Sequence, residues 1–328
     1  MMLQLVNLSN YSTDLVLIRN DAAELQAFLQ RNGLDGLEMM FCDSWDPSIH
    51  RLEWIHGVHL QFWPSWLDFW RGDYQELLRQ FGSRANIIAS YGGLKREDWL
   101  NRQRANIRQA REAQAKYLVW HVCHNRLEEI FDWRFSASDR EVVDGAIEVI
   151  NEVADEIPAD MTLLLENLWW PGMTLRDPGI IARLLEKIRH PRLGIMLDTG
   201  HLMNTNQDLR SQAEGIEYVL HTIDSLGEYS RSIHGIHLHY SLSGPYIRQT
   251  RGWNRQSCSL EESISHVLKI DQHLPFTDSQ VCRILDRVRP EWLVHEFVQK
   301  SAGDWEEKVV RQQRALGLRH LKGDETHE

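Results

Sequence analysis

Short, almost continuously apolar runs recur along the chain and alternate with segments whose apolar residues repeat at helical spacing. Eight such runs are present, at residues 3–8, 36–42, 57–62, 117–122, 162–168, 193–198, 235–240 and 292–298. Runs of this length and character are typical of strands that are buried on both faces of a parallel sheet. The helix-period segments lie between them, at residues 21–32, 139–156, 178–189, 207–226 and 304–316.

The alternation of strand and helix predicts an α/β fold, and eight repeats predict a single (β/α)8 TIM barrel, with a doubly wound open sheet as the alternative. No Pro/Gly/Ser-rich linker divides the 328 residues, so we expect one barrel domain over 1–320 and a polar C-terminal tail over 321–328. Long loop insertions, 63–84 and 241–275, follow the third and seventh runs. In a barrel both insertions lie at the C-terminal ends of the strands, where active sites are built.

Charge and composition narrow the functional classes. Asp and Glu outnumber Lys and Arg by 47 to 36, and the resulting net charge of −11 disfavours DNA as a partner, because DNA-binding domains are usually basic. No apolar stretch approaches the roughly 18 residues of a membrane span, and no signal-peptide pattern opens the chain. The 4 cysteines have no CxxC spacing, which is typical of reduced thiols. We therefore expect a cytoplasmic protein without a membrane span.

Side chains that can bind metal ions stand at the ends of the predicted strands and in the second insertion. They are His59, His121, Glu166, Asp198, His201, His237, Asp271, His273 and Glu296. A single strand histidine is more often a hydrogen-bonded core residue, but such residues on six strands are expensive to bury unless they are paired or coordinated. Imidazole and carboxylate ligands suit Zn²⁺, Mn²⁺, Fe²⁺ or Co²⁺. Nine ligands are too many for one tetrahedral ion, so we expect two or three divalent metal ions, with Glu166 and Glu296 able to bridge.

The motifs LDTGH at 197–201 and DQH at 271–273 resemble those of the xylose isomerase-like barrel superfamily, and within it the endonuclease IV branch with its trinuclear metal site. The resemblance covers roughly residues 55–300. It implies three groups of ligands: His59, His121 and Glu166 for a first ion; Glu166, Asp198, His237 and Glu296 for a second; and His201, Asp271 and His273 for a third. It also implies that Glu166 and Glu296 take part in catalysis.

Clustered metal ions suit phosphoryl displacement, so the resemblance implies a metal-dependent phosphodiesterase. One departure from the endonuclease pattern is His239-Tyr240, which stands where those relatives have an acidic residue and an amide. Together with the net charge, this departure indicates a small or medium-sized phosphate-bearing substrate other than DNA. The segment HLQFWPSWLDFWRGD at 59–73 resembles the cobamide-remodelling phosphodiesterases, which implies that the nucleotide loop of a cobamide is cut.

Aromatic and basic residues in the two insertions are candidates for substrate binding. The first insertion carries three tryptophans on one helix face, Trp63, Trp66 and Trp70. They fit either packing against the barrel or an apolar wall for a large flat ligand. The second insertion carries three arginines, Arg248, Arg251 and Arg255. They fit either an ordinary solvated face or a phosphate clamp.

Two further residues are candidates for contact with substrate. Glu38 lies in the second apolar run, where either a substrate contact or a buried salt bridge is expected, and His239 has the same strand parity as His237. No GxSxG, P-loop or GxGxxG motif is present, so no nucleotide cofactor is expected. Two other functions stay open: a sugar or sugar-phosphate isomerase or epimerase that uses only the second ligand group, with one or two ions, and a non-catalytic protein with structural metal.

Overall fold

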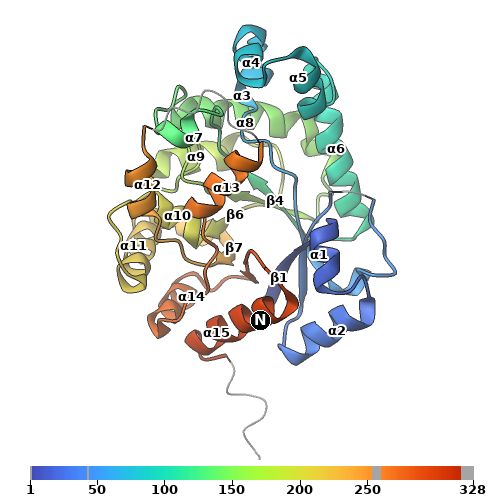
Figure 1. The fold of residues 1–328 in the computed structure, drawn as a ribbon, viewed down its shortest axis with the longest axis vertical. Coiled ribbons are helices and arrows are strands. Elements are labelled where there is room, and N and C mark those ends of the chain that lie inside the picture. Colours follow the sequence, from blue (N-terminus) through green and yellow to red (C-terminus); the bar gives the residue numbers. More distant parts are fainter. Residues whose placement is uncertain (1, 43, 253–259, 319–328) are drawn as a thin grey trace, which may run out of the picture.

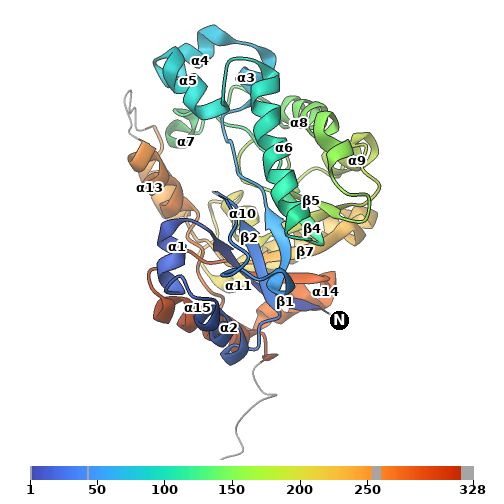
Figure 2. The same ribbon diagram turned by 90° about the vertical axis from the view of Figure 1, so that its right-hand side faces the viewer.

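The computed structural model describes residues 2–42, 44–252 and 260–318, and the predicted tail at 321–328 lies outside them. Parallel strands close in sequence order into a barrel (Figure 1 and Figure 2). The strands are β1 (Leu3–Ser9), β2 (Gly36–Met40), β3 (Ile55–His59), β4 (Tyr117–His121), β5 (Thr162–Glu166), β6 (Leu193–Asp198), β7 (Ile233–Leu238) and β8 (Trp292–His295). Each strand overlaps one predicted run, so the predicted (β/α)8 TIM barrel is confirmed.

Helices surround the barrel (Figure 1). They are α1 (Ser12–Leu17), α2 (Ala22–Arg31), α3 (Leu67–Arg71), α4 (Tyr74–Phe81), α5 (Arg84–Tyr91), α6 (Arg96–Glu112), α7 (Glu129–Asp132), α8 (Asp139–Val153), α9 (Pro178–Lys187), α10 (Thr199–Asn204), α11 (Gln212–Ser225), α12 (Gly244–Thr250), α13 (Leu260–Ile270), α14 (Cys282–Val288) and α15 (Ala302–Ala315). The five segments with helical periodicity correspond to α2, α8, α9, α11 and α15. Among the described residues, none of these helices has the length and apolar character needed to cross a membrane.

Helix α8 shows how the local sequence sets these outer helices. The Ser138 hydroxyl accepts the backbone N–H of Glu141, and the Glu141 carboxylate accepts the backbone N–H of Ser138. This reciprocal pair is a capping box, which satisfies donors at the start of the helix. Val142, Ala146 and Val149 are buried along one face of the helix and belong to the large apolar cluster between strands and helices. The capping box sets where the helix begins, and the apolar residues along one side set which face it buries.

A small apolar cluster fills the inside of the barrel and supports the ligand-type residues. Its members are Leu5, Tyr117, Val119, Leu164, Met196, Trp292 and Val294. Because side chains alternate along a strand, the residues two positions beyond Val119, Leu164, Met196 and Val294 point into the same interior, at the C-terminal ends of the strands. Those residues are His121, Glu166, Asp198 and Glu296. We call this end of the interior the barrel mouth.

The first insertion contains α3 and α4, and α5 follows it; these three helices project beyond the barrel at one end of the molecule (Figure 1 and Figure 2). The Trp66 ring stacks on Trp99 of α6 with 5.9 Å between ring centres, and its indole donates to the Cys123 carbonyl at 2.7 Å. The Trp70 indole donates to Glu148 of α8 at 2.7 Å. Both side chains are 5% exposed. Trp63 and Trp66 precede α3, which begins at Leu67, so the predicted common helix face is wrong. Of the two interpretations of these tryptophans, packing against the barrel applies to Trp66 and Trp70.

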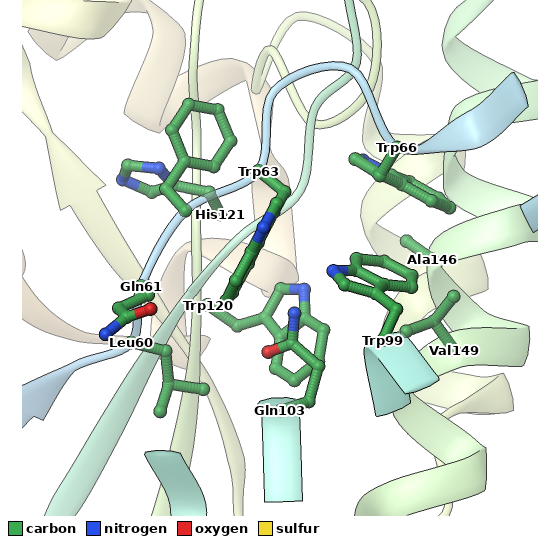
Figure 3. A pocket seen from close by; sticks show the side chains of 11 residues that line it. Leu60, Gln61, Trp63, Trp66, Trp99, Gln103, Trp120, His121, Ala146 and Val149 are labelled. Carbon is green, nitrogen blue, oxygen red and sulfur yellow. The ribbon is translucent and has the colours of Figure 1, made fainter. Parts of the chain in front are cut away.

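Trp63 is half-buried, and its indole donates to the Ser90 carbonyl at 2.9 Å. It lines a small cavity of about 30 Å³ together with His121, Trp120 and Gln103 (Figure 3). Pockets for small-molecule ligands are roughly 300–1,000 Å³. The cavity behind Trp63 is thus far too small for a wide flat ligand.

Replacing Trp66 with alanine should lower the free energy of unfolding by about 3–5 kcal/mol, because it removes a buried indole and leaves the Cys123 carbonyl without its donor. Urea denaturation followed by circular dichroism measures this loss. Trp63→Ala is the matched control on the same segment, and it should cost clearly less because Trp63 is only half-buried. Equal, small losses in both variants would contradict the packing role of Trp66.

Candidate metal centre

The barrel mouth holds three sets of side chains whose ligand atoms converge. The first set is His59, His121 and Glu166; the second is Glu166, Asp198, His237 and Glu296; the third is His201, His239, Asp271 and His273. In each set, one ligand atom from every residue lies within 4.8 Å of the others. The nine residues predicted as ligands therefore lie together in the groups that the resemblance implied, and His239 joins the third.

Glu166, the last residue of β5, lies between the first two sets. Its Oε2 is 2.8 Å from His121 Nε2 and 3.1 Å from His59 Nε2. Its Oε1 is 3.2 Å from Nδ1 of His237 and 3.2 Å from Nδ1 of His201. The side chain is fully buried. Oε2 thus faces the first set, and Oε1 faces the second set and His201 of the third, which is the arrangement that a bridging ligand requires.

Glu38 contacts His237 of the second set on the side of the ring that faces away from the other ligands. His237 Nδ1 is 3.2 Å from Glu296 Oε2, whereas its Nε2 is 2.9 Å from Glu38 Oε1. The Tyr117 hydroxyl donates to Glu38 Oε2 at 2.8 Å. Glu38 is 2% exposed, so it is placed as a buried partner of His237 rather than as a surface for substrate. Carboxylates behind ligand histidines orient the ring and raise its basicity.

The third set is organised by the LDTGH motif. Asp198 caps α10, where its Oδ1 accepts the backbone N–H of His201 at 2.6 Å. His201 Nε2 then lies 3.1 Å from Asp271 Oδ2, and His273 Nδ1 lies 3.4 Å from the same oxygen. Asn167 exchanges two hydrogen bonds with the backbone of Asp198, each 2.9 Å long. This amide, one position after Glu166, therefore joins the end of β5 to the end of β6.

Aromatic rings other than those of Trp66 and Trp70 contact the ligand histidines. Phe62 meets the ring of His121 edge-on with 4.4 Å between centres, and it lies parallel to Trp170 at 6.5 Å. Trp169 meets His201 at 5.1 Å. Within the described residues, the indole N–H groups of Trp169 and Trp170 have no hydrogen-bond partner. Trp169 and Trp170 are 5% and 3% exposed, as buried as Trp66 and Trp70, whereas Phe62 is half-buried. We call these three residues the aromatic cluster, of which Phe62 is the accessible member.

The described arginines of the second insertion do not converge as a phosphate clamp would require. Arg248 donates to the backbone carbonyl of Gln207 and lies 3.6 Å from Asp208, so it holds a neighbouring loop. Arg251 is exposed. Arg255 lies outside the described residues.

Comparison with known proteins identifies the family. Residues 26–316 match the sequence model of the xylose isomerase-like TIM barrel. The chain belongs to this family. A search of curated protein sequences gave no match.

Solved structures share the fold of this xylose isomerase-like barrel. A D-tagatose 3-epimerase-like protein aligns with a TM-score of 0.53 and 15% identity, over 97% of this chain and 98% of that chain. Endonuclease IV from Thermus thermophilus aligns with a TM-score of 0.51 and 15% identity, over 96% and 99%. D-psicose 3-epimerase aligns with 0.52 and 11% identity, over 96% and 97%. At such identities the likeness shows the fold alone, and the function has to be argued from the site.

In this member of the xylose isomerase-like family, the three sets fit divalent metal ions. His59 Nδ1 is 2.9 Å from the Leu60 carbonyl and His201 Nδ1 is 3.0 Å from the Asn167 carbonyl, so each ring keeps its other nitrogen for the set. Such outer contacts are characteristic of metal-binding histidines. In the third set, His239 Nδ1 and Asp271 Oδ1 are buried and have no hydrogen-bond partner in the described part of the chain. All donors are nitrogen or oxygen, which suits Zn²⁺, Mn²⁺ or Fe²⁺.

The charged groups of the mouth shift one another's pKa values. Burial on its own lowers the pKa of His237, but the surrounding carboxylates, Glu296 first, outweigh it and raise that pKa well above its usual value. His201 has its pKa raised in the same way, with Asp198 as the strongest influence against burial. Burial raises the pKa of Asp198 to about 6. Without metal, His201 and His237 therefore hold protons at neutral pH, and an incoming ion has to displace them.

Metal binding should release protons and strengthen as the pH rises from about 6 to about 8, because only the neutral imidazole is a ligand and the raised pKa values of His201 and His237 keep both rings protonated in the metal-free protein. Calorimetric titration of the metal-free protein with Zn²⁺, in buffers of different ionisation enthalpy, counts the released protons. A binding enthalpy that is independent of the buffer would contradict this expectation.

Proposed function

We propose that the protein is a metal-dependent phosphodiesterase that acts on a phosphodiester other than DNA. The observation that carries this proposal is the position of Glu166, whose two oxygens face the first and second ligand sets separately. Divalent ions held by these two sets would supply an activated water and stabilise the charge that develops on the leaving oxygen. A shared Glu166 fixes the distance between the two sets, and an in-line displacement requires such fixed positions.

Glu296 is the carboxylate of the second set best placed to move a proton. Its side chain is 13% exposed, whereas those of Asp198 and Glu166 are fully buried. Burial raises the pKa of Glu296, and the neighbouring Asp198 and Glu166 carboxylates raise it further, against the effect of His237. A carboxylate with a raised pKa is a better general base near neutral pH. Glu296 would then accept the proton of the attacking water.

The substrate class that we infer is a cobamide, cut in its nucleotide loop. The net charge of −11 disfavours a DNA duplex. The aromatic cluster of Phe62, Trp169 and Trp170 lies against the ligand histidines His121 and His201. The half-buried Phe62 ring, stacked on the buried Trp170, suits contact with the apolar face of a wide macrocycle. This contact supports the same substrate class as the resemblance of segment 59–73, although Trp66 and Trp70 in that segment are packed away.

A sugar isomerase or epimerase is the second candidate, because the second set forms a complete site on its own. Glu166, Asp198, His237 and Glu296 offer four ligands without help from the other sets. Solved structures that share this fold include a D-psicose 3-epimerase. The two candidates differ in their products, so a single experiment separates them. Metal-loaded protein is incubated with bis(p-nitrophenyl) phosphate, with a cobamide and with ketohexoses, and the products are separated by chromatography.

Replacing Glu166 with glutamine should reduce phosphodiester turnover by roughly a hundredfold or more, because the amide weakens the binding of two ions at once. Turnover and metal content are measured on the same sample, and circular dichroism checks the fold. Glu129→Gln is the matched control: Glu129 is also buried, but it accepts backbone N–H groups of Arg126 and Ser136 outside the centre. Full turnover and an unchanged metal content in Glu166→Gln would refute the bridging role.

Replacing Phe62 with alanine should raise KM for the cobamide about 5- to 150-fold, which corresponds to roughly 1–3 kcal/mol for a lost apolar contact. Hydrolysis of bis(p-nitrophenyl) phosphate should change little, since a small diester reaches only the ligand sets. Trp63→Ala is the matched control one residue further along, where the indole bonds to Ser90 instead. Equal losses with both substrates would reject the cobamide and leave the general phosphodiesterase proposal standing.

A further inference from the structure

His239 is the residue of the barrel mouth that the predicted ligand groups leave without a role in metal binding. It follows β7 directly, two positions after His237, and its side chain is fully buried. Its ring lies flat against that of His273, with 4.2 Å between the ring centres and 6° between the planes. One nitrogen of each ring lies within 4.8 Å of a carboxylate oxygen of Asp271 and a ring nitrogen of His201. Three imidazoles and one carboxylate therefore converge at this point.

Two buried atoms of this third set have no hydrogen-bond partner among the described residues. They are Nδ1 of His239 and Oδ1 of Asp271. An unpartnered polar atom in a buried position costs free energy, and native structures seldom leave one without a water, an ion or a ligand. Two of them in one set of donors point to an ion.

Residues of the LDTGH motif position the His239 backbone and leave space for its ring. The Thr199 hydroxyl donates to the His239 carbonyl at 2.6 Å and accepts its backbone N–H at 3.2 Å. A Cβ on Gly200 would lie 2.1 Å from Cε1 of the His239 ring, so only glycine leaves room for the ring there. The next residue of the motif is His201, itself a member of the set. The motif thus positions two histidines of the third set at once.

We propose that His239 is the fourth protein ligand of the third metal ion, and that this ion is structural. Four protein ligands would complete a tetrahedral site and leave no position for water or substrate, as in structural zinc sites, once the stacked rings of His239 and His273 turn so that one nitrogen of each points at the ion. The first set supplies only His59, His121 and Glu166, which leaves a coordination position open. Water and substrate would therefore bind at the first and second sets. This assignment goes beyond the proposed function, since it holds for a hydrolase and for an isomerase alike.

The structural ion would join three separate parts of the chain. His201 belongs to α10, His239 follows β7, and Asp271 and His273 follow α13. Beside them, Tyr240 and Leu274 form an isolated antiparallel bridge, with hydrogen bonds of 2.8 and 3.1 Å. The bridge pairs one residue of each segment, so it is a short connection between the end of β7 and the end of the second insertion. A metal ion at the third set holds the end of the insertion against the barrel, and such a cross-link stabilises the folded chain.

The test measures metal content and coordination, and it does not depend on any activity. The wild-type protein, His239→Asn and the control His190→Asn are loaded with Co²⁺ and analysed for metal per chain and for visible absorption. His190 is also a buried histidine, but it bonds to the Met161 carbonyl away from the mouth. We expect His239→Asn to bind one ion fewer per chain than the wild type and to lose the intense absorption of one tetrahedral Co²⁺. His190→Asn should keep both.

Gly200→Ala provides a second variant that keeps every ligand. The added Cβ displaces the His239 ring, so this variant should also lose the third ion or bind it more weakly, with a lower melting temperature in the presence of metal. Hydrogen exchange at residues 271–274 should become faster in both variants. An unchanged Co²⁺ content and spectrum in His239→Asn, or in Gly200→Ala where His239→Asn does not fold, would overturn the proposal. A wild-type protein that binds no third ion would overturn it as well.

Discussion

The fully buried carboxylate of Glu166 sets the conditions for the whole barrel mouth. A buried negative charge is costly by several kcal/mol unless close positive charges or hydrogen-bond donors offset it. Here each of its oxygens faces imidazoles, those of His59 and His121 on one side and those of His201 and His237 on the other. Those rings come from four different elements of the barrel. The closed order of the strands is what brings them around one residue.

The neighbours of the ligand sets are constrained as strongly as the ligands. Tyr117 bonds to Glu38, and Glu38 bonds to His237, which connects β4, β2 and β7 across the inside of the barrel. Gly57 leaves the space for the Tyr117 ring, because a Cβ there would lie 2.0 Å from it. Asn167 ties the ends of β5 and β6 together through the backbone of Asp198. Such support holds donors in place before any ion binds, which is the general requirement for a precise metal site.

The sequence predicted the strands and the ligand positions because both follow from local patterns. Buried parallel strands are short apolar runs, and their period of two decides which residue at the end of a strand faces the interior. The roles of Glu38, Trp66 and Trp70 depend on distant partners and were not decided by such patterns. Glu38 meets a histidine that lies 199 positions away, and one apolar helix face suits packing as well as a ligand wall. Strand parity did place His239 toward the mouth, but it gave no means to assign it to a set.

The charge balance of the mouth links the number of bound ions to the kind of substrate. The three sets contain four carboxylates, and Glu38 adds a fifth behind His237. Three divalent ions bring six positive charges, so with neutral imidazoles the loaded mouth carries one positive charge, which matches the single negative charge of a phosphodiester. One ion in the second set alone leaves a surplus of negative charge, which repels phosphate and tolerates an uncharged sugar. A structural third ion would therefore influence the reaction without touching the substrate, because its charge would help to decide which substrate the first two sets accept.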